Sequence, residues 1–244
     1  MVLACASAWS APAAGEEVHV AVASNFRHTL RVLARDYESQ GGSAVKVSSA
    51  STGKLYAQIR KGAPYDLFLA ADTRRPAHLE ADGLTVPGER FTYALGRLAL
   101  WSPDPNLLDD GAGALKGTRI ERLAIANPKT APYGEAARQA LVRLELWPRY
   151  RRRVVRGENV SQAFQFAAAR TVDAAFVALS QLCTSRYRDR GSLWEVPPGL
   201  YDPIEQQAAL LNRAAANRDA REFLAFLRSP GAREILRAHG YRLP

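Results

Sequence analysis

The sequence predicts an α/β fold of two lobes that are joined by two crossing segments. Short apolar strands alternate with amphipathic helices, which is the pattern of mainly parallel sheets flanked by helices. Two long extended stretches, 90–102 and 201–211, lie between the α/β blocks of this 244-residue chain. If both stretches cross, one lobe comprises 16–95 plus 206–244 and the other comprises 96–205. This arrangement is a clamshell with a double crossover hinge, and ligands of such folds bind between the lobes.

The first block contains three strands and the helices that follow them. VHVAVA (18–23) alternates as a strand does, and the apolar residues after it recur with helical spacing as far as Tyr37. AVKVSSA (44–50) predicts a second strand, and a short helix starts in STGK (51–54). YDLFLAA (65–71) is a continuous apolar run, which is typical of a strand buried in a parallel sheet.

The second block repeats the same alternation. Strands are predicted at RLAIANP (122–128), VVRGEN (154–159) and DAAFVAL (173–179). Amphipathic helices are predicted over 134–146 and 161–170. The middle of the chain therefore has the elements of a second parallel sheet.

Composition and charge limit the classes of function. Hydrophobic residues make up 47% and charged residues 23%, which indicates a packed globular protein. The net charge is +9, but the basic residues are scattered apart from the run RYRRRVVR (149–156), which we interpret as a solvated face. We expect no nucleic-acid partner. A diffuse positive field favours the approach of a small anion.

An enzyme is disfavoured by the motifs. The chain has no G-x-S-x-G or H-E-x-x-H sequence, and its four histidines lack metal-ligand spacing. GAGALKG (111–117) follows a polar loop and has the wrong glycine spacing for a dinucleotide site. The prediction is therefore a protein without catalytic residues, without a cofactor and without direct metal ligands.

The N-terminal stretch resembles an export signal. Residues 1–14 are small and apolar and end in the sequence APAA, which suits signal peptidase, but no basic n-region precedes it. We interpret 1–14 as a signal peptide that is truncated, and expect a periplasmic protein. Lipid anchoring at Cys5 is disfavoured because the apolar run before VLAC is too short.

Four turns between a strand and a helix share one chemistry. They carry Ser24 and Asn25 in AVASNF, Thr52 in STGK, Tyr133 in APYG and Val160 in GENVSQ. Helix N-termini have unpaired backbone N–H groups and partial positive charge, so converging turns would make an anion site. For any single turn, ordinary capping by the Ser, Asn and Thr side chains is the favoured explanation. The set of four turns is more informative than its members, but periodicity does not show convergence.

The order of several motifs resembles one family over almost the whole chain. These motifs are SSASTGKLYAQIRKGAPYDLFLAAD (48–72), IANPKTAPYGEAA (125–137), GENVSQAF (157–164), YDPIEQQAA (201–209) and GAREILRAHGYRLP (231–244). They are similar to those of the extracytoplasmic molybdate-binding proteins of bacterial ABC uptake systems, which have the type II periplasmic binding protein fold.

The resemblance implies a ligand site at the four turns. Ser24 matches a hydroxyl donor after the first strand, and Asn25 follows it as in one branch of the family. Thr52 stands where most members have a Ser. Tyr133 and Val160 match positions that donate through their backbone N–H groups.

One position departs from the family pattern. Some members add a Tyr phenol after a later strand, where this chain has Ala178, so the number of direct contacts stays open. The resemblance implies capture of molybdate, and of tungstate as well, by a monomer that delivers it to a membrane permease with its ATPase. The rival interpretations are a binding protein for another tetrahedral oxyanion such as sulfate, and a sensor domain on the same fold.

Overall fold

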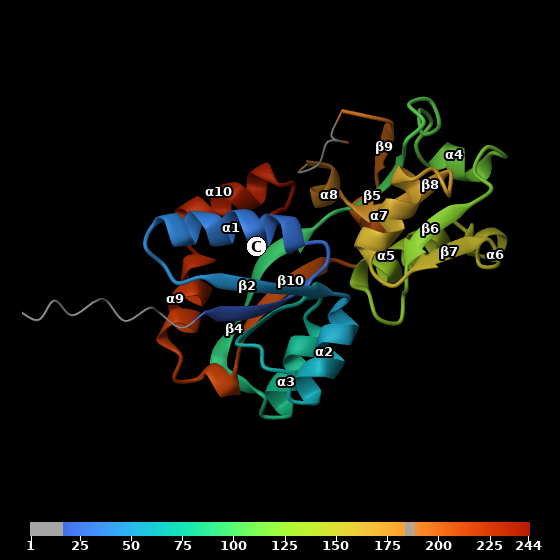
Figure 1. Ribbon diagram of the computed structural model, residues 1–244. Coiled ribbons are helices and arrows are strands. Elements are labelled where there is room, and N and C mark those ends of the chain that lie inside the picture. The colour runs from blue at the N-terminus through green and yellow to red at the C-terminus, as the bar shows by residue number, and fades with distance from the viewer. Residues whose placement is uncertain (1–16, 184–186, 188) are drawn as a thin grey trace, which may run out of the picture.

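The computed structural model describes residues 17–183, 187 and 189–244, which form two five-stranded sheets side by side (Figure 1). The first sheet has the order β2-β1-β3-β10-β4. Its strands are β1 (Val18–Ala23), β2 (Val45–Ala50), β3 (Leu67–Leu69), β4 (Thr85–Gly96) and β10 (Ile204–Leu211). The second sheet has the order β7-β6-β8-β5-β9. Its strands are β5 (Leu98–Ser102), β6 (Leu123–Ala126), β7 (Val154–Gly157), β8 (Ala174–Ala178) and β9 (Ser192–Glu195).

Each sheet is mainly parallel and has one strand that runs against its neighbours. In the first sheet, β1 pairs in parallel with β2 and β3, whereas β10 is antiparallel to β3 and β4. In the second sheet, β6 pairs in parallel with β7 and β8, whereas β5 is antiparallel to β8 and β9. The predicted α/β class, with two mainly parallel sheets, is confirmed.

Helices flank both sheets (Figure 1). Those packed on the first sheet are α1 (Arg27–Ser39), α2 (Thr52–Arg60), α3 (Arg74–Ala81), α9 (Arg218–Phe226) and α10 (Pro230–Ala238). Those of the second lobe are α4 (Ala112–Lys116), α5 (Pro132–Arg143), α6 (Trp147–Tyr150), α7 (Val160–Ala168) and α8 (Leu179–Cys183). Two short 3-10 turns, Pro198–Leu200 and Asn212–Ala214, flank β10. No helix among the described residues is long and apolar enough to cross a membrane.

The first sheet is buried on both faces. Successive side chains of β1 point alternately to the helices on one face and to those on the other. Val20 and Val22 belong to a core cluster that includes residues of α1, α9 and α10. Ala21 and Phe68 point to the opposite face, where they share a cluster with Leu55 of α2. Because successive side chains of a strand alternate between faces, the buried part of β1, Val20 to Ala23, is apolar at every position.

The second sheet is built in the same way. Leu100 and Ile125 share a core cluster with Ala137 of α5. Trp101 and Val177 lie in another cluster, with Ala163 of α7. Both faces are therefore covered, and this holds the loops at the strand ends in fixed positions.

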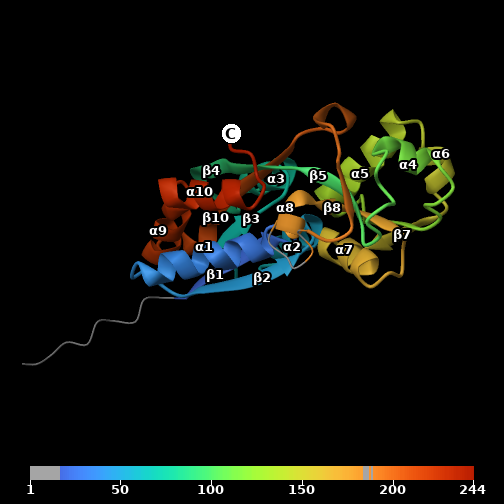
Figure 2. The ribbon, with the colours of Figure 1, turned by 90° about the horizontal axis from the view of Figure 1, so that it is seen from above.

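Two connections join the lobes. In Figure 2, β4 leads directly into β5, with only Arg97 between the two strands. The return connection runs from Glu195 at the end of β9 to Ile204 at the start of β10, and the Arg97 guanidinium donates to the Glu195 carboxylate beside it. The predicted lobe boundaries lie at the end of β4 and the start of β10, and the division stays a prediction. The predicted signal peptide and Cys5 lie outside the described residues.

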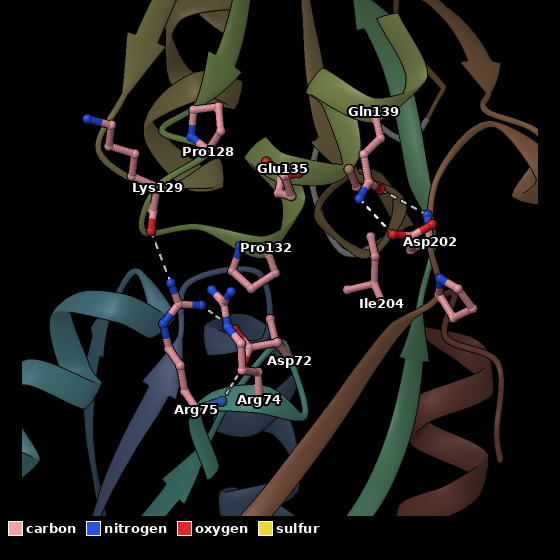
Figure 3. A pocket seen from close by; sticks show the side chains of 13 residues that line it. Asp72, Arg74, Arg75, Pro128, Lys129, Pro132, Glu135, Gln139, Asp202 and Ile204 are labelled. Carbon is pink, nitrogen blue, oxygen red and sulfur yellow. Dashed lines mark hydrogen bonds and ion pairs between the residues drawn. The ribbon is translucent and has the colours of Figure 1, made fainter. Parts of the chain in front are cut away.

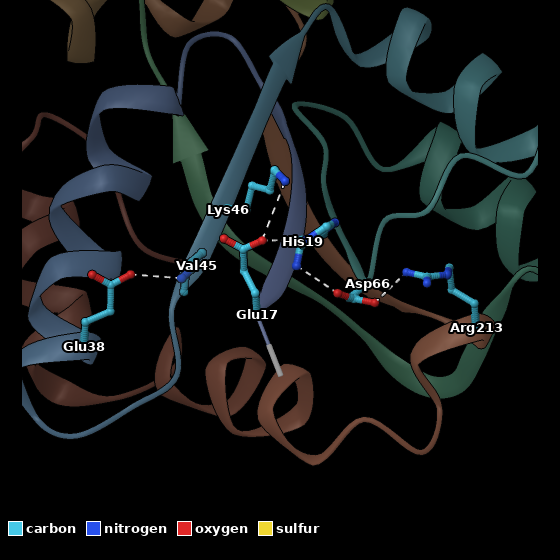
Figure 4. Close-up of polar contacts among 7 residues, drawn as sticks. All are labelled: Glu17, His19, Glu38, Val45, Lys46, Asp66 and Arg213. Carbon is cyan, nitrogen blue, oxygen red and sulfur yellow. Dashed lines mark hydrogen bonds and ion pairs between the residues drawn. The ribbon is translucent and has the colours of Figure 1, made fainter. Parts of the chain in front are cut away.

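One buried carboxylate ties together the starts of the neighbouring strands β1 and β3 (Figure 4). Asp66 accepts the backbone N–H of His19 at 2.8 Å and pairs with Arg213 at 2.8 Å. The Asp66 side chain is only 8% exposed, so its hydrogen bonds offset the cost of burying the charge. This contact fixes the start of β3 against β1.

Candidate ligand-binding site between the lobes

A small cavity lies where the four predicted turns meet. Its lining comes from both lobes and has no charged side chain: Ala23, Ser24, Asn25, Ser51, Thr52, Ala71, Ala131, Pro132, Tyr133 and Val160. The space that the centre of a water-sized molecule can occupy is about 10 Å³. That is far below the roughly 300 Å³ at which pockets for drug-sized molecules begin. The cavity therefore suits a small ion, and all five sequence-predicted site residues line it.

Four backbone amides at this cavity have no hydrogen-bond partner among the described residues. Within the described part of the chain, no hydrogen bond uses the N–H groups of Asn25, Thr52, Tyr133 or Val160. Thr52, Tyr133 and Val160 stand at the first or second position of α2, α5 and α7, and Asn25 precedes α1 by two residues. Buried amides without partners are rare in proteins, so four around one cavity indicate a site for hydrogen-bond acceptors. The N–H of Ser24 is different, because it donates to Ala50 O at 3.0 Å.

The capping interpretation of these turns is wrong for the predicted side chains. The N-cap residues of α1 and α5 are Phe26 and Ala131, which make no side-chain cap. Helix α7 is capped by Asn159, whose side chain accepts from two amides. Thr52 is a helical residue, and its hydroxyl oxygen accepts the N–H of Ala71 at 3.2 Å. That leaves the Thr52 hydroxyl proton available to a ligand.

Ser51 is a candidate site residue that the sequence interpretation missed. It is the N-cap residue of α2 and makes no side-chain cap. Its hydroxyl is buried and, among the described residues, has no hydrogen-bond partner. A buried hydroxyl without a partner costs free energy, and this one lines the cavity. In the sequence Ser51 is a typical capping residue, so only the folded structure distinguishes it from an ordinary helix cap.

The side chains of Asn25 and Tyr133 belong to a buried polar network rather than to the cavity. The Asn25 carboxamide donates to Gln206 at 2.9 Å, and Gln206 donates to the Tyr133 hydroxyl at 3.3 Å. Burial raises the pKa of the Tyr133 phenol well above its ordinary value, so the group stays neutral. No negative charge therefore arises beside the cavity from this side chain.

Ala178 does not take part in the cavity. It is the last residue of β8 and is fully buried, and its N–H donates to the side chain of Gln181 at 3.0 Å. The cavity lining does not include it. The position at which some members of the resembled family have a phenol therefore supplies no contact from its own side chain here.

Several hydrogen bonds cross between the lobes around the cavity. Ser161 of α7 donates its hydroxyl to Ser24 O at 3.1 Å, and Ser180 donates to Asn25 O at 3.3 Å. On the other side, the N–H of Gly53 donates to Thr130 O at 2.8 Å. The lobes are therefore in contact on both sides of the cavity, as in a closed clamshell.

A wider hollow opens next to the cavity and shares Ala71 and Pro132 with it. Its wall carries charges of both signs, including Asp72, Arg74 and Arg75 from the first lobe and Lys129, Glu135 and Asp202 from the second (Figure 3). The Asp202 carboxylate accepts hydrogen bonds from Arg143 and Gln139, and these hold its pKa below the ordinary value. Charged side chains thus surround the mouth, while the cavity itself is lined by neutral groups.

The described residues hold no group of three or more His, Cys, Asp or Glu that could bind a metal ion. The arrangement offers amide and hydroxyl donors to a small acceptor-rich ligand, and it places no nucleophile beside a base.

Comparison with known proteins shows the family to which the chain belongs. Residues 18–242 match the family model described as bacterial extracellular solute-binding protein. The molybdate-binding protein ModA of Azotobacter vinelandii is 43% identical over 99% of this chain and 94% of its own length. ModA of Rhodobacter capsulatus is 42% identical over 94% and 90% of the two chains.

A solved structure shows the same fold. The periplasmic molybdate-binding protein of Azotobacter vinelandii superposes with a TM-score of 0.90 at 41% sequence identity, over 93% of this chain and 99% of that one. The match spans both sheets, so the two-lobed periplasmic binding protein architecture is confirmed. The chain belongs to the bacterial extracellular solute-binding protein family, in the group of the ModA proteins.

Proposed function

We propose that this chain binds molybdate between its lobes and is the periplasmic binding protein of a molybdate ABC transporter. The observation that carries this proposal is the set of four unpartnered amides around a cavity without charged side chains. The names of its ModA relatives support the choice of molybdate. We assign the ligand contacts to the backbone amides of Asn25, Thr52, Tyr133 and Val160 and to the hydroxyls of Ser24, Thr52 and Ser51.

The donor set matches the charge state of the ligand. Molybdate and tungstate are fully ionised tetrahedral dianions at neutral pH, so every oxygen accepts hydrogen bonds and none must donate. Phosphate keeps a proton near neutral pH and needs an acceptor, and the cavity lining offers no carboxylate. Helix N-termini supply positive potential without a buried counter-charge, which avoids the desolvation cost of an ion pair. Tungstate is therefore a ligand of the same site.

The proposed role involves no chemical step. The first lobe, 16–95 plus 206–244, and the second, 96–205, close on the oxyanion, and the closed form docks on the permease with its ATPase. Because ligand and permease both favour the closed form, capture is coupled to delivery. The protein acts as a monomer, is not an enzyme and needs no cofactor.

The experiment is a calorimetric titration of the purified, ligand-stripped protein with molybdate, tungstate, sulfate and phosphate at one salt concentration. We expect one-to-one binding of molybdate and tungstate and no heat from phosphate. Sulfate binding as tight as that of molybdate would identify a general oxyanion site. The proposal fails if none of the four anions binds.

A further inference from the structure

We infer that Arg75 is a positioning residue that fixes the closed spacing of the two helix N-termini at Thr52 and Tyr133. This inference rests on the proposed function, because its effect is measured through oxyanion binding. Arg75 is not among the residues that line the cavity; it acts on the 127–131 loop of the second lobe. The role is a latch between lobes, which we call the Arg75 latch and define as Arg75, Asp72, Gly53 and the carbonyls of Lys129 and Thr130.

The Arg75 side chain bridges the lobes. It belongs to α3 of the first lobe, and its side chain is only 10% exposed. One guanidinium nitrogen pairs with Asp72, which also accepts the Arg75 N–H at 2.9 Å. Another nitrogen donates to Lys129 O of the second lobe at 3.1 Å (Figure 3). Asp72 thus holds the guanidinium in place, and one fork contacts both lobes.

A second hydrogen bond crosses beside the first. The N–H of Gly53 donates to Thr130 O at 2.8 Å, so consecutive carbonyls of one loop each accept a donor from the opposite lobe. Gly53 is next to Thr52, and Thr130 lies three residues before Tyr133. The two bonds therefore set the spacing between the amides of Thr52 and Tyr133, which the proposed ligand must span.

Electrostatics explain why such a latch is needed. Helices α2 and α5 present their N-termini to the same cavity, and partial charges of the same sign repel each other. The Thr130 carbonyl, which accepts the Gly53 N–H, places a negative dipole end against the N-terminus of α2 and offsets this repulsion. The Arg75 charge is itself paired with Asp72, so the latch adds little net charge to the mouth.

Gly53 leaves no room for a side chain at this contact. A Cβ atom on Gly53 would lie 3.0 Å from both Cα and O of Thr130 and 3.2 Å from an Arg75 nitrogen. The two nearest atoms are backbone of the other lobe, so closure would stop a few tenths of an ångström earlier. In the open form the same Cβ would meet no second lobe, and alanine favours the helix more than glycine does.

The test compares three variants, Arg75→Ala, Gly53→Ala and the matched control Arg74→Ala. Arg74 lines the same hollow, but it is exposed and its side chain makes no hydrogen bond or ion pair among the described residues. For each protein, molybdate affinity and dissociation rate are measured, together with ligand-free stability in urea. Small-angle X-ray scattering at saturating molybdate reports closure.

We expect Arg75→Ala and Gly53→Ala each to raise Kd by about tenfold or more, the equivalent of one charge-assisted hydrogen bond. The change lies in a faster dissociation rate, and the liganded radius of gyration is larger. Gly53→Ala keeps or gains ligand-free stability, which separates the latch from a folding defect, and Arg74→Ala matches the wild type. Wild-type affinity and compaction in both Arg75→Ala and Gly53→Ala would overturn the inference. Wild-type protein that binds no oxyanion would instead overturn the proposed function.

Discussion

The carboxamide nitrogen of Asn25 lies 2.9 Å from the side-chain oxygen of Gln206, which comes from the returning strand β10. The same nitrogen also donates to the Tyr241 hydroxyl at 3.2 Å, and burial raises the pKa of Tyr241 to about 12. Gln206 is fully buried and also accepts from the Tyr93 hydroxyl at 3.1 Å. The Asn25 side chain therefore serves this network, and its backbone N–H remains for the proposed ligand.

Replacing Asn25 by Ala removes two buried hydrogen bonds and keeps the backbone amide. We expect the free energy of unfolding to fall by about 1–3 kcal/mol, because buried polar groups lose a partner. Molybdate affinity should fall by less than about tenfold. Urea denaturation and calorimetry measure the two quantities. Unchanged stability with lost binding would show that the side chain, and not the amide, contacts the ligand.

Ser51→Ala separates ligand contact from structure. No cap hydrogen bond is lost, and an unpartnered buried hydroxyl disappears, so the ligand-free protein should be as stable as the wild type or more stable. Molybdate binding should weaken by about 1.5–3 kcal/mol, the value of a hydrogen bond to a charged group. Calorimetry together with urea unfolding tests both expectations.

The chain offers a matched control for Ser51. The Thr85 hydroxyl is also buried without a partner among the described residues, but it lies outside the cavity lining. Thr85→Val should keep or raise stability and leave Kd unchanged. If Ser51→Ala behaves in the same way, the Ser51 hydroxyl does not reach the ligand.

Thr52→Ala and Thr52→Ser form a second pair. Alanine removes the acceptor of the Ala71 N–H, so we expect about 1–3 kcal/mol less stability and a similar loss of binding free energy. Serine keeps the hydroxyl and should retain affinity within about threefold of the wild type. Calorimetric titration of both variants gives the comparison. Equal loss in both would assign the effect to packing of the threonine methyl group.

The lowered pKa values of two histidines lead us to expect that stability depends on pH. Burial, and then the nearby His28 charge, lowers the pKa of His239, and its ring nitrogen lies 3.0 Å from the Thr29 hydroxyl. Burial, followed by Arg31, Arg27 and Arg35, lowers the pKa of His28. Both folded-state pKa values lie below the ordinary 6.5, so the unfolded chain binds these protons first. The stability that these two neutral histidines contribute is present above pH 6.5 and is lost as pH falls below it.

Urea unfolding between about pH 7.5 and 5.5 measures this loss. His239→Asn retains a hydrogen-bonding group near Thr29 and cannot be protonated, so its stability should depend less on pH over this range. An unchanged slope would mean that other groups cause the dependence.

The sequence predicts the parts of the site more fully than their arrangement. The four turns follow from strand and helix periodicity, and Thr52 is of a residue type that is common at helix starts. Their convergence depends on contacts such as that of Gly53 with Thr130, which join distant parts of the chain. No periodic pattern carries that information.

Side-chain orientation is also beyond the sequence. The sequence around Asn25 is the same whether its side chain points to a ligand or to Gln206. Its orientation depends on Gln206 of β10, which lies 181 residues further along the chain. Ser51 resembles an ordinary cap until its hydroxyl is seen without a partner. The family resemblance predicts Tyr133 and Val160 as backbone donors, at positions where the fold, and not the side chain, would define the role.

Main-chain amides at the cavity have a consequence for evolution and for engineering. A substitution at Tyr133 or Val160 changes the side chain and leaves the N–H group where the helix places it. Random point mutation therefore alters this chemistry only through the backbone, and selection can tolerate varied residues at these positions. A designer who wants a larger or smaller anion must move one helix start relative to another, by loop insertion or a changed closing angle.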